Sequence, residues 1–181
     1  GISTSPLSYK YWWKNPEELK NATNTATLHL IELVVELAKI DQETGKWIHI
    51  DIEPEPDGIL ENQKEFVDWY ENTLIPLGAE YLQNKGVNNP VHLIKRHIQL
   101  CFDICHFGVS YDSPAACIQE LNQKGIGIGK IQISSALRVD LRTNPQEKID
   151  ALRKYHEPVY LHQVKALLAN GQYLQYKDLD E

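Results

Sequence analysis

The sequence lacks several features that define whole classes of protein. It contains no methionine, only three cysteines and no apolar run approaching the roughly 20 residues that span a bilayer. Cys101, Cys105 and Cys117 are odd in number and lie in apolar surroundings, which is typical of reduced core thiols rather than of a disulfide framework. The first residues show no basic stretch followed by a signal-like core. We therefore expect a cytoplasmic protein without membrane insertion.

Basic residues are scarce as well. The chain has 18 lysines and arginines against 25 acidic residues, a formal net charge of -7, and its cations are scattered. Proteins that bind nucleic acid usually group their cations in a patch or stripe, so we expect no nucleic-acid partner and favour a small-molecule metabolite. The 181 residues, 42% of them hydrophobic, can bury one substantial core, which predicts a single domain over residues 1–181.

A polar residue followed by proline predicts four helix starts, because the polar side chain caps the helix and proline suits its first position. The pairs are Asn15-Pro16, Asn89-Pro90, Ser113-Pro114 and Asn144-Pro145. The first helix is predicted from Pro16 to Ile40. Another is predicted from Asn62 to a glycine stop at Gly86, with Glu65 at the capping-box position.

Strand-like runs lie between the predicted helices and alternate between apolar and polar residues. They cover residues 2–6, 47–53, 98–104, 130–134 and 159–164. Alternation of strands with helices predicts an α/β fold with a parallel sheet. A doubly wound sheet would be apolar on both faces. A closed barrel instead packs one face on its outer helices and turns the other inward, which fits the observed alternation.

Five strands cannot close an eight-stranded barrel. We therefore expect about strands four to eight of a TIM (β/α)8 barrel, with the N-terminal βα units missing, in agreement with the absent methionine and the opening on Gly1-Ile2-Ser3-Thr4. The upstream half of the barrel or a homo-oligomer partner would complete the fold. A five-stranded open α/β sheet is the alternative.

Two predicted strand ends carry residues suited to a metal. Glu53 is followed by Pro54 and Pro56, which stiffen the strand exit, and its phase points it into the barrel; the alternative is a solvated acidic loop. Asp103 is followed three residues later by His106, and the alternative for this pair is a role in capping the loop. Carboxylate and imidazole together suit Mn, Fe, Co or Zn.

Other residues have weaker signals. Gln132 and His162 point to the same strand-end region, while His49, Asp51 and Lys130 lie deeper on the same face, Lys130 with an expected ion pair to a carboxylate. We favour packing of the aromatic cluster that contains Trp12 under its own loop. The alternative is a stacking wall for a sugar. The glycine-rich segment 125–129 precedes a strand, so it predicts a tight backbone approach rather than a phosphate cradle.

These motifs carry a resemblance to a family. Glu-Pro-x-Pro at one strand end and Asp-x-x-His at the next resemble the xylose-isomerase-like TIM barrel superfamily, which includes sugar isomerases, sugar-phosphate epimerases and endonucleases acting on abasic DNA. More narrowly, four segments are similar to the metabolite-traffic family called EboE. The segments are residues 2–7, 49–56, 103–107 and 130–137.

The resemblance implies a ligand set. It implies a divalent metal held by Glu53, Asp103 and His106, with Gln132 and His162 at the positions of the strand-seven and strand-eight ligands. Gln132 replaces a His or Asp of the superfamily, and His162 replaces an acidic residue of its paired acid-base groups. Glu55 stands where xylose isomerases have a substrate-binding lysine, which argues against a xylose isomerase in the strict sense.

We therefore expect a metal-dependent sugar or sugar-phosphate isomerase or epimerase, in which the metal stabilises an enediolate and Glu53 or His162 moves the proton. Trp12 and Glu55 are candidates for substrate contact, and Lys10 and Arg138 for phosphate binding, although both cations could be plain surface charges. The alternative is a metabolite-binding or trafficking protein on the same barrel. An abasic-site nuclease is disfavoured by the net charge.

Overall fold

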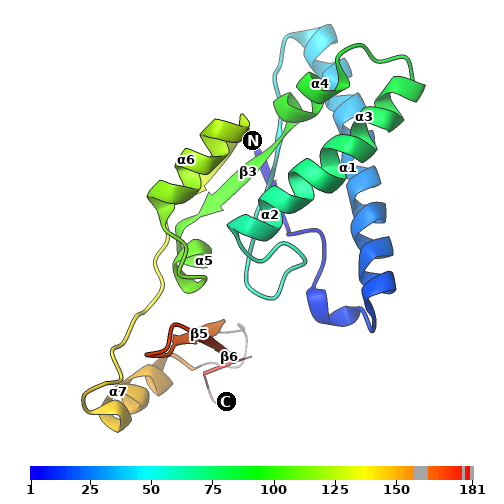
Figure 1. The fold of residues 1–181 in the computed structure, drawn as a ribbon. Coiled ribbons are helices and arrows are strands. Elements are labelled where there is room, and N and C mark those ends of the chain that lie inside the picture. Colours follow the sequence, from blue (N-terminus) through cyan, green and yellow to red (C-terminus); the bar gives the residue numbers. More distant parts are fainter. Residues whose placement is uncertain (157–162, 177, 180–181) are drawn as a thin grey trace. The chain divides into compact units, whose positions relative to one another are not determined.

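The computed structural model describes residues 1–156, 163–176 and 178–179 (Figure 1). The chain falls into two compact units, Gly1–Ser134 and Ser135–Glu181, and each is described by itself. Within the described parts of both units, no helix has the length and apolar character needed to cross a membrane.

Unit 1 contains a four-stranded, wholly parallel sheet, which confirms the predicted α/β class. Its strands are β1 (Ile2–Thr4), β2 (Ile50–Ile52), β3 (Ile98–Asp103) and β4 (Ile128–Gln132), in the order β1-β2-β3-β4. The first four predicted strands are therefore present. Because each strand pairs with the next one along the chain, right-handed crossovers place the connecting helices on one face of the sheet.

The helices of unit 1 are α1 (Pro16–Thr44), α2 (Gln63–Trp69), α3 (Ile75–Asn84), α4 (Pro90–His97), α5 (Ile104–Val109) and α6 (Pro114–Lys124), with a 3-10 turn η1 (Lys10–Trp12). The helix predicted over 62–86 is interrupted by a π-helical segment, η2 (Tyr70–Leu74), which separates α2 from α3. It ends as expected near Gly86, whose φ of 77° requires the left-handed conformation that glycine adopts readily.

All four predicted proline starts are confirmed, at α1, α4, α6 and α7 (Pro145–Leu152). Among the polar residues of these four pairs, only Asn15 caps its helix as expected, by accepting a hydrogen bond from the Glu18 N–H at 2.9 Å. Asn89 and Asn144 instead adopt left-handed backbone conformations, and neither they nor Ser113 make a side-chain cap. Proline, rather than the polar cap, is the common signal of these helix starts.

The hydrophobic core lies on one face of the sheet. Ile52, Leu100 and Phe102 share one strand phase and pack with helix residues such as Ile31 and Phe66. The opposite phase is polar, and Asp51, Gln99 and Asp103 are buried on it. The structure thus confirms the predicted polar and apolar alternation in β2 and β3, whereas Ile131 and Ile133, expected on the packed face, are exposed.

The glycine-rich segment 125–129 leads into β4 and makes the tight backbone approach expected from the sequence. Leu100 pairs with Ile128 and Cys101 with Lys130, so Gly129 is an extra residue at a bulge. A β-carbon on Gly127 would lie 2.9 Å from the Gln99 side chain, and one on Gly129 would overlap that of Asp51. Glycine is therefore needed at both positions for the backbone to pass over buried polar groups.

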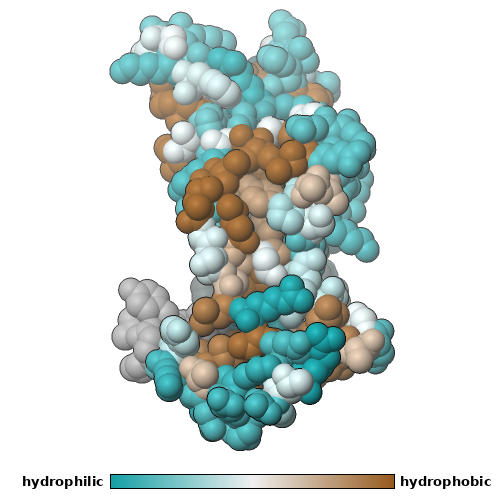
Figure 2. Space-filling model, turned by 90° about the vertical axis from the view of Figure 1, so that its left-hand side faces the viewer, coloured by the Kyte–Doolittle hydropathy of each residue, from teal (hydrophilic) through white to brown (hydrophobic). Residues whose placement is uncertain are grey.

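Both edges of the sheet leave apolar side chains exposed. Ile2 on β1 is 58% exposed, Ile131 on β4 is 52% exposed, and Ile133 just beyond β4 is 86% exposed. Apolar side chains also gather on the molecular face drawn in Figure 2. The four strands do not close into a barrel, so the described sheet has two open edges.

Unit 2 contains α7, a 3-10 turn η3 (Arg153–Tyr155) and an antiparallel hairpin of β5 (Val164–Leu167) and β6 (Tyr173–Tyr176). Residues 159–162 of the predicted fifth strand lie outside the described residues. The remainder does not extend the parallel sheet, because Val164 begins β5 and pairs with Tyr176. The expected fifth parallel strand is thus absent from the described part of the chain.

Candidate functional site

Glu53, Asp103 and Gln132 meet at the carboxyl edge of the sheet. Asp103 and Gln132 end neighbouring strands β3 and β4 and are paired in register. Glu53 follows β2, and its backbone N–H donates to Thr4 O at 3.0 Å, so it continues the strand. Because parallel strands place their carboxyl ends at one edge of the sheet, Glu53 and Gln132 come into contact although they are 79 positions apart in the sequence.

The Gln132 side chain joins the two carboxylates. Its Nε2 donates to Glu53 Oε1 at 2.8 Å and to Asp103 Oδ2 at 2.6 Å. One amide group therefore occupies the space between two acidic groups, where it satisfies both. The same amide would present its oxygen to a cation if it rotated by half a turn, since the two amide atoms are nearly the same size.

Asp103 is held in a network of donors. Its Oδ1 accepts from the Cys105 N–H at 2.9 Å and from Ser134 Oγ at 2.5 Å. Burial acts to raise the pKa of Asp103, but the hydrogen bonds from Ser134 and Cys105 and the nearby His106 outweigh it, so that the pKa lies below its ordinary value. Asp103 is therefore ionised and oriented at neutral pH.

His106 completes the group from the first turns of α5. Its Nδ1 lies 3.2 Å from the carbonyl oxygen of Pro54 and 3.6 Å from Glu53 Oε1. If Nδ1–H donates to the Pro54 carbonyl, the neutral ring presents Nε2 as its basic atom. A backbone carbonyl that orients an imidazole in this way is a common support for a metal ligand.

Burial raises the pKa of two further side chains at the site, Cys101 and Glu55. The Cys101 thiol donates to Glu53 Oε2 at 3.5 Å, and burial, together with the charge of Glu53, raises the pKa of Cys101 to about 12. Burial also raises the pKa of Glu55, with His106 acting to lower it and Glu53 and Asp103 acting to raise it. The neutral thiol at Cys101 is thus a packing and hydrogen-bonding group rather than a nucleophile.

Cys105 was not predicted as part of the site. One ligand atom from each of Asp103, Cys105 and His106 lies within 4.8 Å of the other two. The apolar neighbours of Cys105 in the sequence predict a core thiol, whereas its side chain is only half-buried. The spacing Asp-x-Cys-His at a strand end was the signal that could have found it, because all three side chains follow the same buried strand.

The other residues predicted to bind substrate make no described contact with Glu53, Asp103, His106 or Gln132. Lys10 makes ion pairs with Glu61 at 2.9 Å and Glu65 at 3.1 Å, and Trp12 is 70% exposed. Arg138 belongs to unit 2 and is exposed. His162 lies outside the described residues. The described contacts therefore connect Glu53, Asp103, His106 and Gln132, while the substrate-binding roles of the others stay predictions.

The deeper polar residues form a second group on the same face. His49 Nδ1 lies 2.6 Å from Oδ1 of the fully buried Asp51. Lys130 was expected to pair with a carboxylate, but its ammonium donates to Ser3 Oγ at 2.9 Å, and no carboxylate among the described residues is within ion-pair distance of it. Lys130 thus connects β4 to β1 across the polar face.

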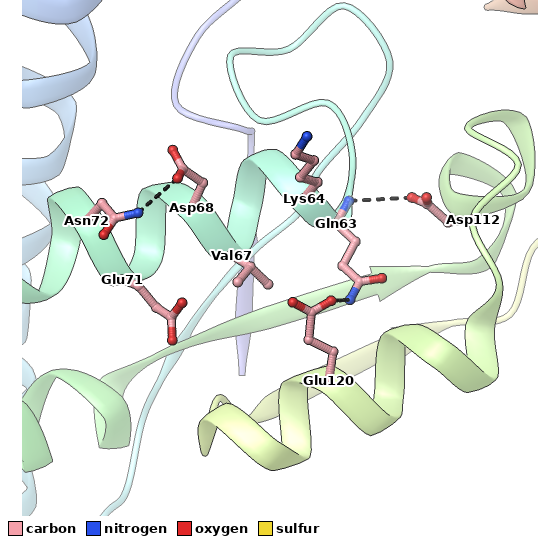
Figure 3. Close-up of a pocket in the computed structure, with 8 residues that line it drawn as sticks. All are labelled: Gln63, Lys64, Val67, Asp68, Glu71, Asn72, Asp112 and Glu120. Carbon is pink, nitrogen blue, oxygen red and sulfur yellow. Dashed lines mark hydrogen bonds between the residues drawn. The ribbon is translucent and has the colours of Figure 1, made fainter. Parts of the chain in front are cut away.

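An acidic pocket lies elsewhere in unit 1, between α2 and α6 (Figure 3). Glu71, Asp112 and Glu120 line it, and Gln63 Nε2 donates to Glu120 Oε2 at 2.5 Å. Lys124 forms an ion pair with Glu71 at 2.6 Å. These contacts give the pocket a structural role in joining the two helices.

No family model, curated protein or solved structure matches this chain. The assignment of a function therefore depends on the chemistry of the residues themselves.

Proposed function

We propose that this protein is a divalent-metal-dependent isomerase or epimerase of the xylose-isomerase-like kind, acting on a sugar, a sugar phosphate or a similar polyhydroxylated metabolite. The observation that carries the proposal is that Glu53 and Asp103, at two neighbouring strand ends, share the Gln132 amide, and that His106 Nδ1 lies 3.6 Å from Glu53 Oε1. Two carboxylates and an imidazole are a donor set that fits Mn, Zn, Fe or Co.

The fold supports the proposal through its strand order. A sheet in the order β1-β2-β3-β4, with an apolar face against helices and a polar opposite face, has the layering of part of a TIM barrel. In TIM barrels active sites lie at the carboxyl ends of the strands, and Glu53 and Asp103 lie at the corresponding edge of this open sheet, which is compatible with part of such a barrel. We propose that the two open sheet edges are completed by further βα units, from upstream sequence or a partner copy.

The residues of the site would divide the work between holding the metal and moving protons. Asp103, His106 and Glu53 would bind the metal, with the Gln132 amide oxygen as a further ligand after rotation. When bound, such a metal polarises a substrate carbonyl. Glu53, and His162 in the completed site, would transfer the proton between adjacent carbons. Glu55, whose pKa burial raises, would contact the substrate oxygens.

A second candidate is a metabolite-binding protein without turnover. It is favoured by the two hydrogen bonds from Gln132, which satisfy Glu53 and Asp103 without any metal. Carboxylates that already accept hydrogen bonds from an amide have less need of a cation. The two candidates differ in whether a metal binds and whether the bound metabolite is converted.

Metal analysis of the purified chain tests the proposal. The protein is stripped with chelator, loaded separately with Mn2+, Zn2+ and Co2+, desalted and measured for bound metal. We expect about one equivalent at a single site, and a loss of affinity of at least roughly tenfold in Asp103→Asn and in His106→Gln. Matched controls are Asp68→Asn and His92→Gln, which change exposed residues on α2 and α4.

Two outcomes would contradict the metal proposal: no bound metal, or the same metal content in the site variants and the controls. If metal binds, turnover is followed by NMR with a panel of ketoses, aldoses and their phosphates, in heavy water. Incorporation of deuterium at the carbon next to the carbonyl supports the isomerase. Metabolite binding without exchange supports the second candidate.

A further inference from the structure

The conformation at the end of β3 brings a thiol to the proposed metal. Cys105 follows Asp103 by two residues and precedes His106, in the first turn of α5. Its backbone N–H donates both to Asp103 Oδ1 and to Ser134 Oγ, each at 2.9 Å. Residue 105 is thus fixed through its own backbone to the carboxylate that the metal would bind.

The side chain of Cys105 is correctly placed for a shared ion. A ligand atom from each of Asp103, Cys105 and His106 lies within 4.8 Å of the others. In a tetrahedral site with bonds of about 2.0–2.3 Å, ligand atoms are about 3.5 Å apart. The three atoms therefore need to close by no more than about 1.3 Å, which side-chain rotation can provide because Cys105 and His106 are only partly buried.

We propose that Cys105 is a thiolate ligand of the metal and makes the site selective for Zn2+, Co2+ or Fe2+ over Mn2+ and Mg2+. This inference rests on the proposed metal site and sharpens it. Sulfur is a soft ligand that favours zinc, cobalt and iron, whereas carboxylate and water sites favour magnesium and manganese. On binding, the S–H bond breaks, a sulfur–metal bond forms, and the proton passes to the buffer.

The other two thiols provide matched comparisons. Cys101 is fully buried on β3, its thiol donates to Glu53, and it is not part of the cluster. Cys117 is buried in α6 and is not part of the cluster. A thiol signal from the bound metal can therefore be traced to one residue by changing each cysteine in turn.

Cobalt absorption spectroscopy tests the proposal on the complete chain. The stripped protein is titrated with Co2+ under argon, and cobalt content is measured in parallel. We expect a sulfur-to-cobalt charge-transfer band in the near ultraviolet that saturates at about one equivalent. The band should vanish in Cys105→Ser and remain in Cys101→Ser and Cys117→Ala. In Cys105→Ser, the ratio of the affinity for Zn2+ to the affinity for Mn2+ should also fall by about tenfold or more.

The possible failures are distinguishable. If cobalt binds without the band, or if the band survives in Cys105→Ser, Cys105 is not a ligand, although the metal site stands. If no cobalt binds, this inference and the proposed metal function fail together. A missing band in the cobalt-loaded unchanged protein overturns the proposal without any variant, whereas the assignment of an observed band to Cys105 rests on comparison of the three cysteine variants.

Discussion

The side chain of Asp51 on β2 lies directly against the backbone of Gly129 on β4, where a β-carbon would overlap its Oδ1 atom. Asp51 has no exposed surface, and the same Oδ1 lies 2.6 Å from His49 Nδ1. Strand β4 therefore passes close to the buried Asp51 carboxylate and its His49 partner. The bulge at Gly129 allows this approach while Lys130 still reaches Ser3.

This contact predicts that Gly129→Ala destabilises unit 1. The added methyl must displace Asp51 or the strand, and overpacking of this kind costs about 1–3 kcal/mol. Urea denaturation followed by tryptophan fluorescence measures the change in the free energy of unfolding. Gly108→Ala in α5 is the control, because a β-carbon there meets no atom within 4 Å. Equal stability of the two variants would show that the close approach does not exist.

A second prediction concerns the buried hydroxyl of Tyr70. It donates to the carbonyl oxygen of Ile98 at 2.9 Å, and both residues have no exposed surface. Tyr70→Phe leaves that carbonyl without its donor, so we expect a loss of about 1–3 kcal/mol in the free energy of unfolding. Thermal and urea unfolding should both detect it. Tyr155→Phe, at a side chain that is 58% exposed, should change stability little.

A third prediction links His97 to the pH dependence of stability. Burial lowers the pKa of His97, with Arg96 acting in the same direction and the bond to the Ile48 carbonyl opposing it. Its Nδ1 lies 2.7 Å from Ile48 O, and its buried Nε2 has no hydrogen-bond partner among the described residues. Protonation would therefore place an N–H at Nε2 where nothing accepts it.

The sign of the effect follows from the lowered pKa. Below the ordinary histidine pKa of about 6.5, the unfolded chain binds a proton that the folded chain does not, so stability falls as the pH drops through this range. The fall levels off below the folded-state pKa. His97→Asn, which keeps a donor near Ile48 O, should lose part of this dependence when unfolding is measured between about pH 7.5 and pH 5. The exposed His92→Asn should retain it.

A fourth prediction concerns the amide of Gln132. Gln132→Glu replaces a donor to Glu53 and Asp103 with a third carboxylate, and like charges at such distances repel. We expect the metal-free variant to unfold at a lower temperature and divalent metal to restore most of the loss. Differential scanning fluorimetry with and without Zn2+ checks this.

The matched control for that experiment is Gln146→Glu. Gln146 donates to Asp150 at 3.0 Å on the exposed surface of α7, so the same change of charge occurs outside the site. The control should respond weakly to the substitution and not to Zn2+. A metal response of equal size in both variants would contradict a specific site around Gln132.

The sequence predicted the local structure well where one residue type controls the backbone. Proline marked the starts of α1, α4, α6 and α7, because its fixed φ suits the first helical position. The polar and apolar alternation predicted the two faces of the sheet. The π-helical interruption at Tyr70–Leu74 was not predicted, since it depends on how that helix packs rather than on a local signal.

Part of the site was also predictable from the two-residue period of strands. Strand phase indicates which side chains share a face, so Glu53, Asp103 and Gln132 could be grouped before their contacts were known. Whether Gln132 reaches one carboxylate or both depends on the separation of the strand ends. Cys105 was assigned to the core because apolar neighbours in sequence do not reveal which way a helix turn faces.

The sequence by itself determined the class of the fold, the helix starts and the polar face on which Glu53 and Asp103 lie, because these follow from local backbone preferences and from the two-residue period of strands. Only the tertiary structure decided that Gln132 closes the gap between the carboxylates and that the Cys105 thiol lies beside Asp103 and His106. Those contacts arise where β2, β3 and β4 end side by side, and no single segment contains the information that sets their distances.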